Sequence, residues 1–250
     1  MKQLSPLVRC LTAPNSNPMT GPGTNSYLVG LDQLALIDPG PIIDSHIKQL
    51  LEYVGDSLAW ILVTHTHPDH SPAARILADK TGAELIGCAM PDDGHQDRTF
   101  RPAKNLQHGD ILKTSEFSLE AIHTPGHVQE EGMLFSGDHI MQGSSVVIIP
   151  PSGDMSEYIE STRKLLPYPM KSIAPGHGNL LTSPSTVLDA VIHHRLMRED
   201  KVVRALLRMG ESSLDALLPE VYRDVDKFTG DGKNVFMGTP FKTRKRQVCS

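Results

Sequence analysis

A cluster of side chains that bind metal ions stands out in the first third of the chain. The stretch ILVTHTHPDHSPAA, residues 61–74, places three histidines and one aspartate within six positions: His65, His67, Asp69 and His70. The cluster directly follows an apolar run that is typical of a buried strand. Because side chains alternate along an extended chain, His65 and His67 are expected to point to the same side. Imidazole and carboxylate ligands without a thiolate suit zinc, iron or manganese, so the cluster predicts a metal site.

Four ligands from one loop do not complete sites for two metal ions, so more must come from distant segments. Three later segments follow strand-like runs and contain small residues that let the backbone come close to a metal. They are IHTPGH, FSGDH and PGHG, which supply His127, Asp138 and His177. The remaining histidines are predicted to be non-ligands. For His193 and His194, on a helix pattern that could face the cleft, we favour a solvated or packed position.

The elements that must position these residues alternate between strand-like and helix-like patterns over about residues 1–183. Apolar spacing predicts helices that begin at Asp44, at the Ser71-Pro72 pair and near Asp154, the last with Met155, Ile159 and Leu166 on its apolar face. Such alternation favours an α/β layered domain. From residue 185 the pattern of apolar residues changes. It predicts one long helix that ends at Gly210, followed by a short helix capped by Ser213. We therefore divide the chain into a catalytic domain (1–183), a helical appendage (184–226) and an irregular basic tail (227–250).

Several motifs, in this order along the chain, resemble those of the metallo-β-lactamase fold superfamily: THTHPDH, HTPGH, FSGDH and PGHG. Within it the chain is similar to the hydroxyacylglutathione hydrolase (glyoxalase II) and RNase Z side, and most similar to the β-lactamase-like protein 2 group. NPMTGPGTNSYLVG, LIDPG and SGDHIMQGSSVVI carry this narrower resemblance. It covers roughly residues 8–222 and implies a four-layer αβ/βα sandwich with a dinuclear metal site at one edge.

The resemblance also implies a role for each ligand. One metal would be held by His65, His67 and His127, the other by Asp69, His70 and His177, and Asp138 would bridge the two. Asp38, at the end of LALID, matches a position that steadies the ligand loop. True β-lactamases of this fold usually lack the bridging aspartate, so Asp138 argues against β-lactam hydrolysis as the native task.

The segment between His127 and Asp138 is shorter than in the related proteins. Asp138 follows His127 by only 11 positions. The outward leg has Val128 to Glu131, about 13 Å at roughly 3.3 Å per residue, which permits only a short hairpin. We hypothesise that residues are missing between about His127 and Glu131, and a true deletion there would displace Asp138.

Composition sets limits on the partners. The chain has 250 residues, a formal net charge of -5, 39% hydrophobic residues and 5% aromatic residues. No apolar run is long enough to span a membrane, no signal peptide is recognised, and Cys10, Cys88 and Cys249 form no CxxC pair. These features predict a cytoplasmic protein. As a separate hypothesis, a second copy of the chain is a candidate partner in a homodimer.

The leading functional hypothesis is a zinc-dependent hydrolase that binds two Zn²⁺ ions per chain, with iron or manganese as alternatives. A hydroxide held by both metals would attack an ester, thioester or phosphodiester, and Asp69 would orient it and take up its proton. Small acyl esters or thioesters and single-stranded RNA remain alternative substrates. The net charge of -5 and the few aromatic residues argue against RNA as the substrate. Cations in the tail and on the long helix argue for it: Lys242, Arg244, Lys245, Arg246, Arg195, Arg198, Lys201, Arg204 and Arg208. A different class of hypothesis is a non-catalytic binding module with an incomplete metal site.

Overall fold

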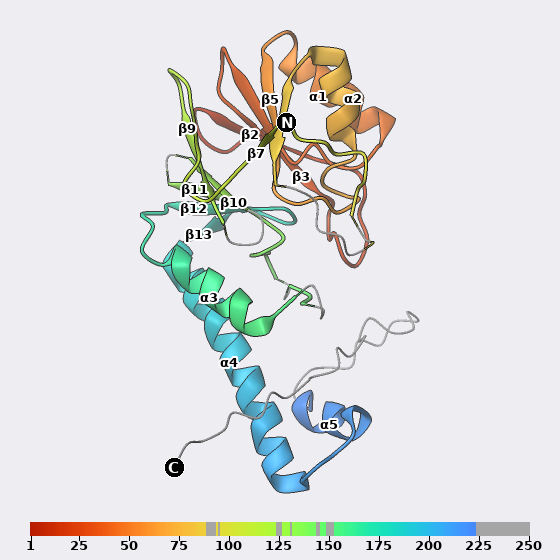
Figure 1. Cartoon of the computed structure of the whole chain (residues 1–250), viewed down its shortest axis with the longest axis vertical. Coiled ribbons are helices and arrows are strands. Elements are labelled where there is room, and N and C mark those ends of the chain that lie inside the picture. The colour runs from red at the N-terminus through yellow and green to blue at the C-terminus, as the bar shows by residue number, and fades with distance from the viewer. Residues whose placement is uncertain are drawn as a thin grey trace.

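The fold consists of two β-sheets packed face to face, with helices on both outer faces (Figure 1). The computed structural model describes residues 1–88, 94, 96–123, 127–130, 132–143, 146–148 and 153–223; of 127–130 it describes the backbone only. The first sheet has the strand order β1-β2-β3-β4-β5-β6-β7, and the second has the order β13-β12-β11-β10-β9-β8. This architecture confirms the predicted four-layer αβ/βα sandwich.

The elements have the following bounds. The first sheet contains β1 (Lys2–Gln3), β2 (Val8–Thr12), β3 (Asn25–Val29), β4 (Leu34–Ile37), β5 (Leu58–Val63), β6 (Glu84–Gly87) and β7 (Lys104–Asn105). The second contains β8 (Ile111–Lys113), β9 (Ser118–Ile122), β10 (His127–Glu130), β11 (Met133–Gly137), β12 (Ser172–Pro175) and β13 (Leu181–Thr182). The helices are α1 (Asp44–Val54), α2 (Ala73–Thr81), α3 (Met155–Leu165), α4 (Pro184–Met209) and α5 (Leu214–Val221).

The central strands β4 and β5 of the first sheet are apolar on both faces because each face meets a different layer. In β4, Leu36 joins a cluster with the buried side of α1 and α2, whereas its neighbour Ile37 faces the second sheet. In β5, Ile61 packs in the cluster with α1 and α2, and Leu62 faces the second sheet. Alternation along each strand thus builds two cores from one sheet.

The second sheet repeats this arrangement on its side of the sandwich. In β11, Phe135 faces the first sheet, while Leu134 packs with Leu165 of α3 and Leu188 of α4. The predicted face of α3 is wrong at its last position, since Leu165 is fully buried and Leu166 is 40% exposed. Helical phase explains the difference, because Leu165 lies at a spacing of three to four residues from the buried Thr162 and Ser161.

The hairpin between β9 and β11 is short, as the sequence predicts. Strand β10 has four residues and pairs antiparallel with β9 on one side and with β11 on the other. His127 is opposite Ile122 and Glu130 is opposite Met133. The short outward leg therefore still completes the ladder that brings β11 back to the edge of the sandwich.

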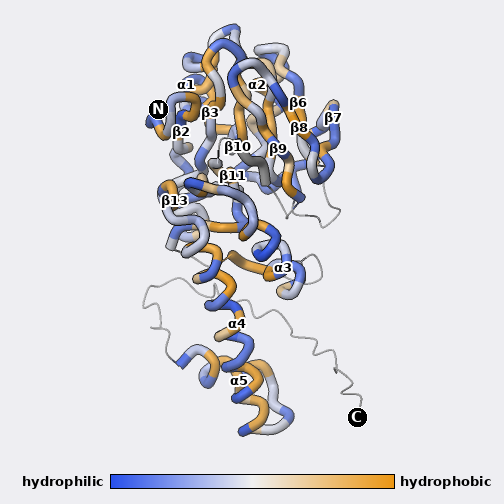
Figure 2. Tube along the Cα trace, turned by 90° about the vertical axis from the view of Figure 1, so that its left-hand side faces the viewer, coloured by the Kyte–Doolittle hydropathy of each residue, from blue (hydrophilic) through white to orange (hydrophobic). Residues whose placement is uncertain are grey.

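The two C-terminal helices extend away from the sandwich (Figures 1 and 2). Helix α4 begins at Pro184 and ends before Gly210, and the Ser213 hydroxyl accepts a hydrogen bond from Ala216 N at the start of α5, as predicted. Helix α2 begins at Ala73, and Ser71 does not cap it. No helix in the described part of the chain is long and apolar enough to cross a membrane. The predicted basic tail lies outside the described residues.

Candidate metal centre

Six of the seven predicted ligands meet at one edge of the sandwich, near the ends of several strands. His65 follows β5, Asp138 follows β11, and His177 follows β12. Strands β4 and β5 are parallel, as are β11 and β12, so the carboxyl ends within each pair lie at the same edge. Strand β3 is antiparallel to β4, so the residues just before β3 reach this edge as well.

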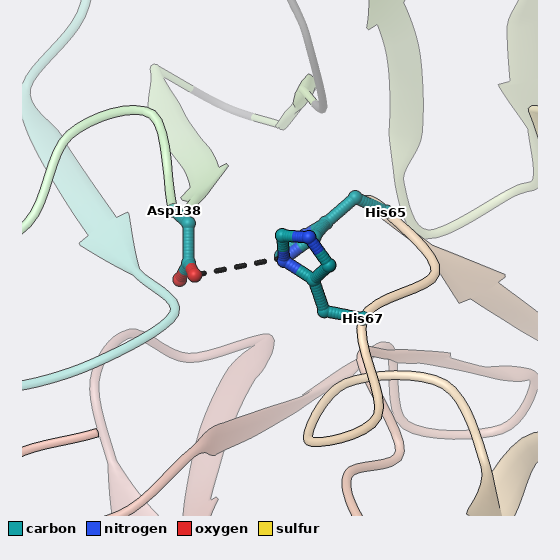
Figure 3. A group of neighbouring side chains, drawn as sticks. All are labelled: His65, His67 and Asp138. Carbon is teal, nitrogen blue, oxygen red and sulfur yellow. Dashed lines mark ion pairs between the residues drawn. The ribbon is translucent and has the colours of Figure 1, made fainter. Parts of the chain in front are cut away.

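Six ligand-type side chains form two adjacent groups. The first contains His65, His67 and Asp138, and the second contains Asp69, His70 and His177; within each group the ligand atoms lie within 4.8 Å of one another. Figure 3 shows the rings of His65 and His67 beside the Asp138 carboxylate. The Oδ2 atom of Asp138 lies 3.6 Å from His65 Nε2, so this aspartate reaches the site despite the short segment before it.

Asp138 faces both groups with different oxygens. Its Oδ2 lies against His65, whereas its Oδ1 lies 3.3 Å from His70 Nε2 and 3.2 Å from His177 Nε2. The second group is closed by Asp69, whose Oδ2 is 3.3 Å from His70 Nε2 and 3.2 Å from His177 Nε2. A carboxylate between two ligand groups is positioned to bridge two cations.

Hydrogen bonds to the outer ring nitrogens fix three of the imidazoles. His70 donates from Nδ1 to Asp38 Oδ2 (3.0 Å), and His177 donates from Nδ1 to the Gly23 carbonyl (3.2 Å). The Thr64 hydroxyl donates to Asp38 Oδ2 (2.7 Å) and so can accept from His65 Nδ1 (3.1 Å). With the proton on Nδ1, each Nε2 lone pair is directed toward the carboxylates.

The donor set fits metal ions. Buried polar atoms normally have hydrogen-bond partners, yet His65 Nε2, His70 Nε2 and Asp138 Oδ1 are buried without one. All three atoms face the centre of the two groups. Imidazole nitrogens and carboxylate oxygens suit zinc, iron and manganese, and a cation at each group would satisfy these atoms.

The pKa values of these groups reflect the crowding of histidines and carboxylates. Burial acts to raise the pKa of Asp138 and of Asp69, but the nearby imidazoles, that of His177 first, outweigh burial and hold both pKa values well below the usual range. Burial acts to lower the pKa of His177, yet its bonds to Asp138 and Asp69 raise it to about 9. The low pKa values keep Asp69 and Asp138 as carboxylates, which is the form that binds a cation.

The remaining histidines of the prediction have other surroundings. The side chain of His127 lies outside the described residues, although its backbone begins β10. His139 is buried and hydrogen-bonds through Nε2 to Thr162 on α3 (3.0 Å), away from both ligand groups. His193 and His194 are exposed on α4, and His194 lines a cavity of about 360 Å³ together with residues that include Met141, Gln142 and Arg195.

Two supports of the ligand loop were not predicted from the sequence. Thr24, just before β3, donates a hydrogen bond to Asp69 Oδ2 (3.1 Å). Asp97 accepts from the Ser71 hydroxyl (2.7 Å), and its backbone N–H donates to Thr66 O (2.6 Å). Thr24 lies in a Gly- and Pro-rich turn that could have marked it, whereas Asp97 is in a segment without periodic pattern.

Comparison with known proteins agrees with this geometry. The sequence pattern described as the metallo-beta-lactamase superfamily matches residues 19–177. A beta-lactamase-like protein 2 homolog from Drosophila melanogaster is 30% identical over 226 residues, which cover 81% of this chain and 75% of that protein. A protein named thioesterase pkgB from Emericella nidulans is 29% identical over 205 residues, or 77% of this chain and 56% of that protein.

Solved structures share the fold at low sequence identity. A beta-lactamase domain protein from Burkholderia ambifaria superposes with a TM-score of 0.69 at 20% identity and covers 88% of this chain and 83% of its own. A metallo-beta-lactamase family protein from Thermus thermophilus gives a TM-score of 0.65 at 18% identity and covers 89% of this chain and 95% of its own. On its sequence pattern, its sandwich and its paired ligand groups, the chain belongs to the metallo-beta-lactamase superfamily, whose members are generally metal-dependent hydrolases.

Proposed function

We propose that the protein is a dinuclear zinc hydrolase that cleaves an ester or thioester. The observation that carries this proposal is the position of Asp138, whose two oxygens face two separate groups of ligands. One bridging carboxylate between two three-residue groups supports two cations per chain. A binding module with a dismantled site would not keep six ligand atoms aimed at one another.

Bound metal ions supply Lewis acidity: they lower the pKa of a water molecule and stabilise negative charge on the substrate oxygen. The side chains of the two ligand groups set where such ions would be held. His65, His70 and His177 are locked by their Nδ1 bonds, so their Nε2 atoms keep a fixed direction. The Asp69 carboxylate lies beside His70 and His177, and from this position we assign it to orient water and accept its proton.

The proposed substrate class is supported by the surroundings of the α4 cations and by one relative. Arg204 pairs with Asp200 (2.7 Å), Arg208 pairs with Glu220 (3.1 Å), and Arg198 donates to Val221 O (2.8 Å). Each of these three cations already has a partner within the chain, which weighs against a role in holding RNA phosphates. The similarity to a protein named thioesterase favours an acyl thioester or ester.

The test is metal analysis together with a panel of substrates. We expect about two metal ions per purified chain and turnover of a short acyl thioester such as an acyl N-acetylcysteamine. Bis(p-nitrophenyl) phosphate and single-stranded RNA are assayed in parallel. A chain that binds at most one metal, or that cleaves RNA but no thioester, would overturn the proposal.

The control variant is His67→Ala, which removes one ligand from the first group. Activity must fall with it, and hydrolysis that survives the change comes from another protein or another site. His193→Ala is the matched comparison, because this histidine is exposed on α4 and belongs to neither ligand group. We expect this second variant to keep both metals and full activity.

A further inference from the structure

Thr24 contacts the second ligand group without being one of its ligands. It lies one residue before β3 and is fully buried. Its hydroxyl donates to Asp69 Oδ2 (3.1 Å), and this oxygen is the one that faces His70 and His177. The hydroxyl therefore reaches the oxygen of Asp69 that would bind the second metal.

Asn15 fixes the direction of this hydroxyl. Its Nδ2 donates to Thr24 Oγ1 (2.9 Å), and its Oδ1 accepts from the Thr24 backbone N–H (2.9 Å). Because Nδ2 already supplies a proton to Oγ1, the hydroxyl's own proton is directed at Asp69. The side-chain amide of Asn15 thus holds Thr24 at two points, and the threonine has one rotor setting that satisfies all partners.

The same short segment also holds His177. The Gly23 carbonyl accepts from His177 Nδ1 (3.2 Å), and Thr24 and His177 form an antiparallel bridge. Gly23 has φ +132, and a Cβ there would lie 1.9 Å from Ala13 O, so the chain passes where only glycine fits. Two of the three members of the second group are consequently oriented by residues 23–24.

We propose that Thr24, backed by Asn15, is a positioning residue that sets the affinity of the second metal group. It keeps Asp69 Oδ2 directed at His70 and His177 before an ion binds. Binding then does not have to immobilise this carboxylate, which lowers the entropic cost and raises the affinity. No atom of Thr24 or Asn15 belongs to either ligand group. The inference rests on the two-metal site of the proposed function, and it concerns metal affinity rather than the identity of the substrate.

The test compares Thr24→Val with Thr24→Ser. Valine keeps the shape of threonine and removes the hydroxyl, whereas serine keeps the hydroxyl and removes one methyl group. Each metal-free protein is titrated with Zn²⁺ against a chromophoric chelator and with Co²⁺, whose visible absorption reports its coordination. We expect Thr24→Val to bind the ion of the second ligand group (Asp69, His70 and His177) about 10- to 100-fold more weakly. The ion of the first ligand group should bind with unchanged affinity. Thr24→Ser should regain most of the lost affinity and the wild-type cobalt spectrum.

Two controls keep the outcomes distinct. Thr81→Val removes a hydroxyl that bonds to Leu77 O on α2 and should change neither affinity. Asn15→Ala removes the bonds that orient the Thr24 hydroxyl and leaves Asp69 unchanged. It should lower the affinity of the second ligand group for its ion by a smaller factor. This variant tests the proposal even if Thr24→Val does not fold. A wild-type chain with fewer than two metals would refute the proposed function itself. A wild-type chain with two metals, together with unchanged second-ion affinity in the folded variants or equal weakening of both ions, would overturn the role of Thr24.

Discussion

The buried carboxylate of Asp38 offers a sharp test of how the metal centre is held. Its Oδ1 accepts from Thr64 N (2.7 Å), and its Oδ2 accepts from the Thr64 hydroxyl (2.7 Å) and from His70 Nδ1 (3.0 Å). The perturbation is Asp38→Asn. Asparagine has almost the same shape and also tolerates the left-handed backbone of this position, φ 51, so the change acts on charge and hydrogen bonding.

The magnitude follows from which bonds asparagine can replace. Its oxygen can still accept from Thr64 N, but its NH₂ group would face the N–H of His70, which is fully buried. An unsatisfied buried donor and the loss of a charge-assisted bond together cost about 3 kcal/mol of unfolding free energy. For a chain of this size that lowers Tm by about 6 to 12 °C.

His70 can escape this penalty by moving its proton to Nε2. Its Nδ1 would then accept from the asparagine NH₂, and stability would be largely retained. The lone pair aimed at the second ligand group would be lost, so metal affinity would fall, by about 10- to 100-fold. The variant must therefore lose stability, metal affinity or both.

The assay is thermal unfolding of the metal-free protein together with chelator competition for zinc. Asp154→Asn is the matched control, because Asp154 caps α3 by accepting from Ser156 N and Glu157 N, and asparagine caps helices equally well. An Asp38→Asn protein with wild-type Tm and wild-type zinc affinity would refute the reasoning.

Three further predictions test the surroundings of the site. Asp97→Ala leaves the Ser71 hydroxyl without its acceptor and should lower the unfolding free energy by about 2 to 4 kcal/mol, measured by urea denaturation. Gly23→Ala forces a Cβ to within 1.9 Å of Ala13 O and should lose either the fold, by circular dichroism, or the second metal, by metal analysis; a normal protein would contradict the close approach. Burial lowers the pKa of His46 below 6.5, so the unfolded chain binds more protons in acid and the unfolding free energy falls as pH drops below about 6.5. His46→Gln should flatten that slope, and an equal slope in both proteins would count against a buried neutral imidazole.

The sequence alone determined the local part of the site and the class of the fold. His65, His67, Asp69 and His70 are close in the chain, so a strand followed by a helix start brings them together without any long-range contact. The alternation of apolar runs with helical patterns likewise predicted a layered α/β architecture. The prediction was wrong about which of two neighbouring leucines is buried at the end of α3, Leu165 or Leu166.

Only the tertiary structure decided how the distant residues meet. The orientation of Asp138 toward both groups depends on how β11 returns after the four-residue strand β10, which no local pattern specifies. The supports of the ligands come from far along the chain: Asp38 is 32 residues from His70, Thr24 is 45 from Asp69, and Gly23 is 154 from His177. Such contacts form where two sheets share an edge. The motif resemblance indicated Asp38, but no such role was predicted for Thr24 or Gly23. The sequence thus determined the ligand types, and the packing of the sandwich determined their directions.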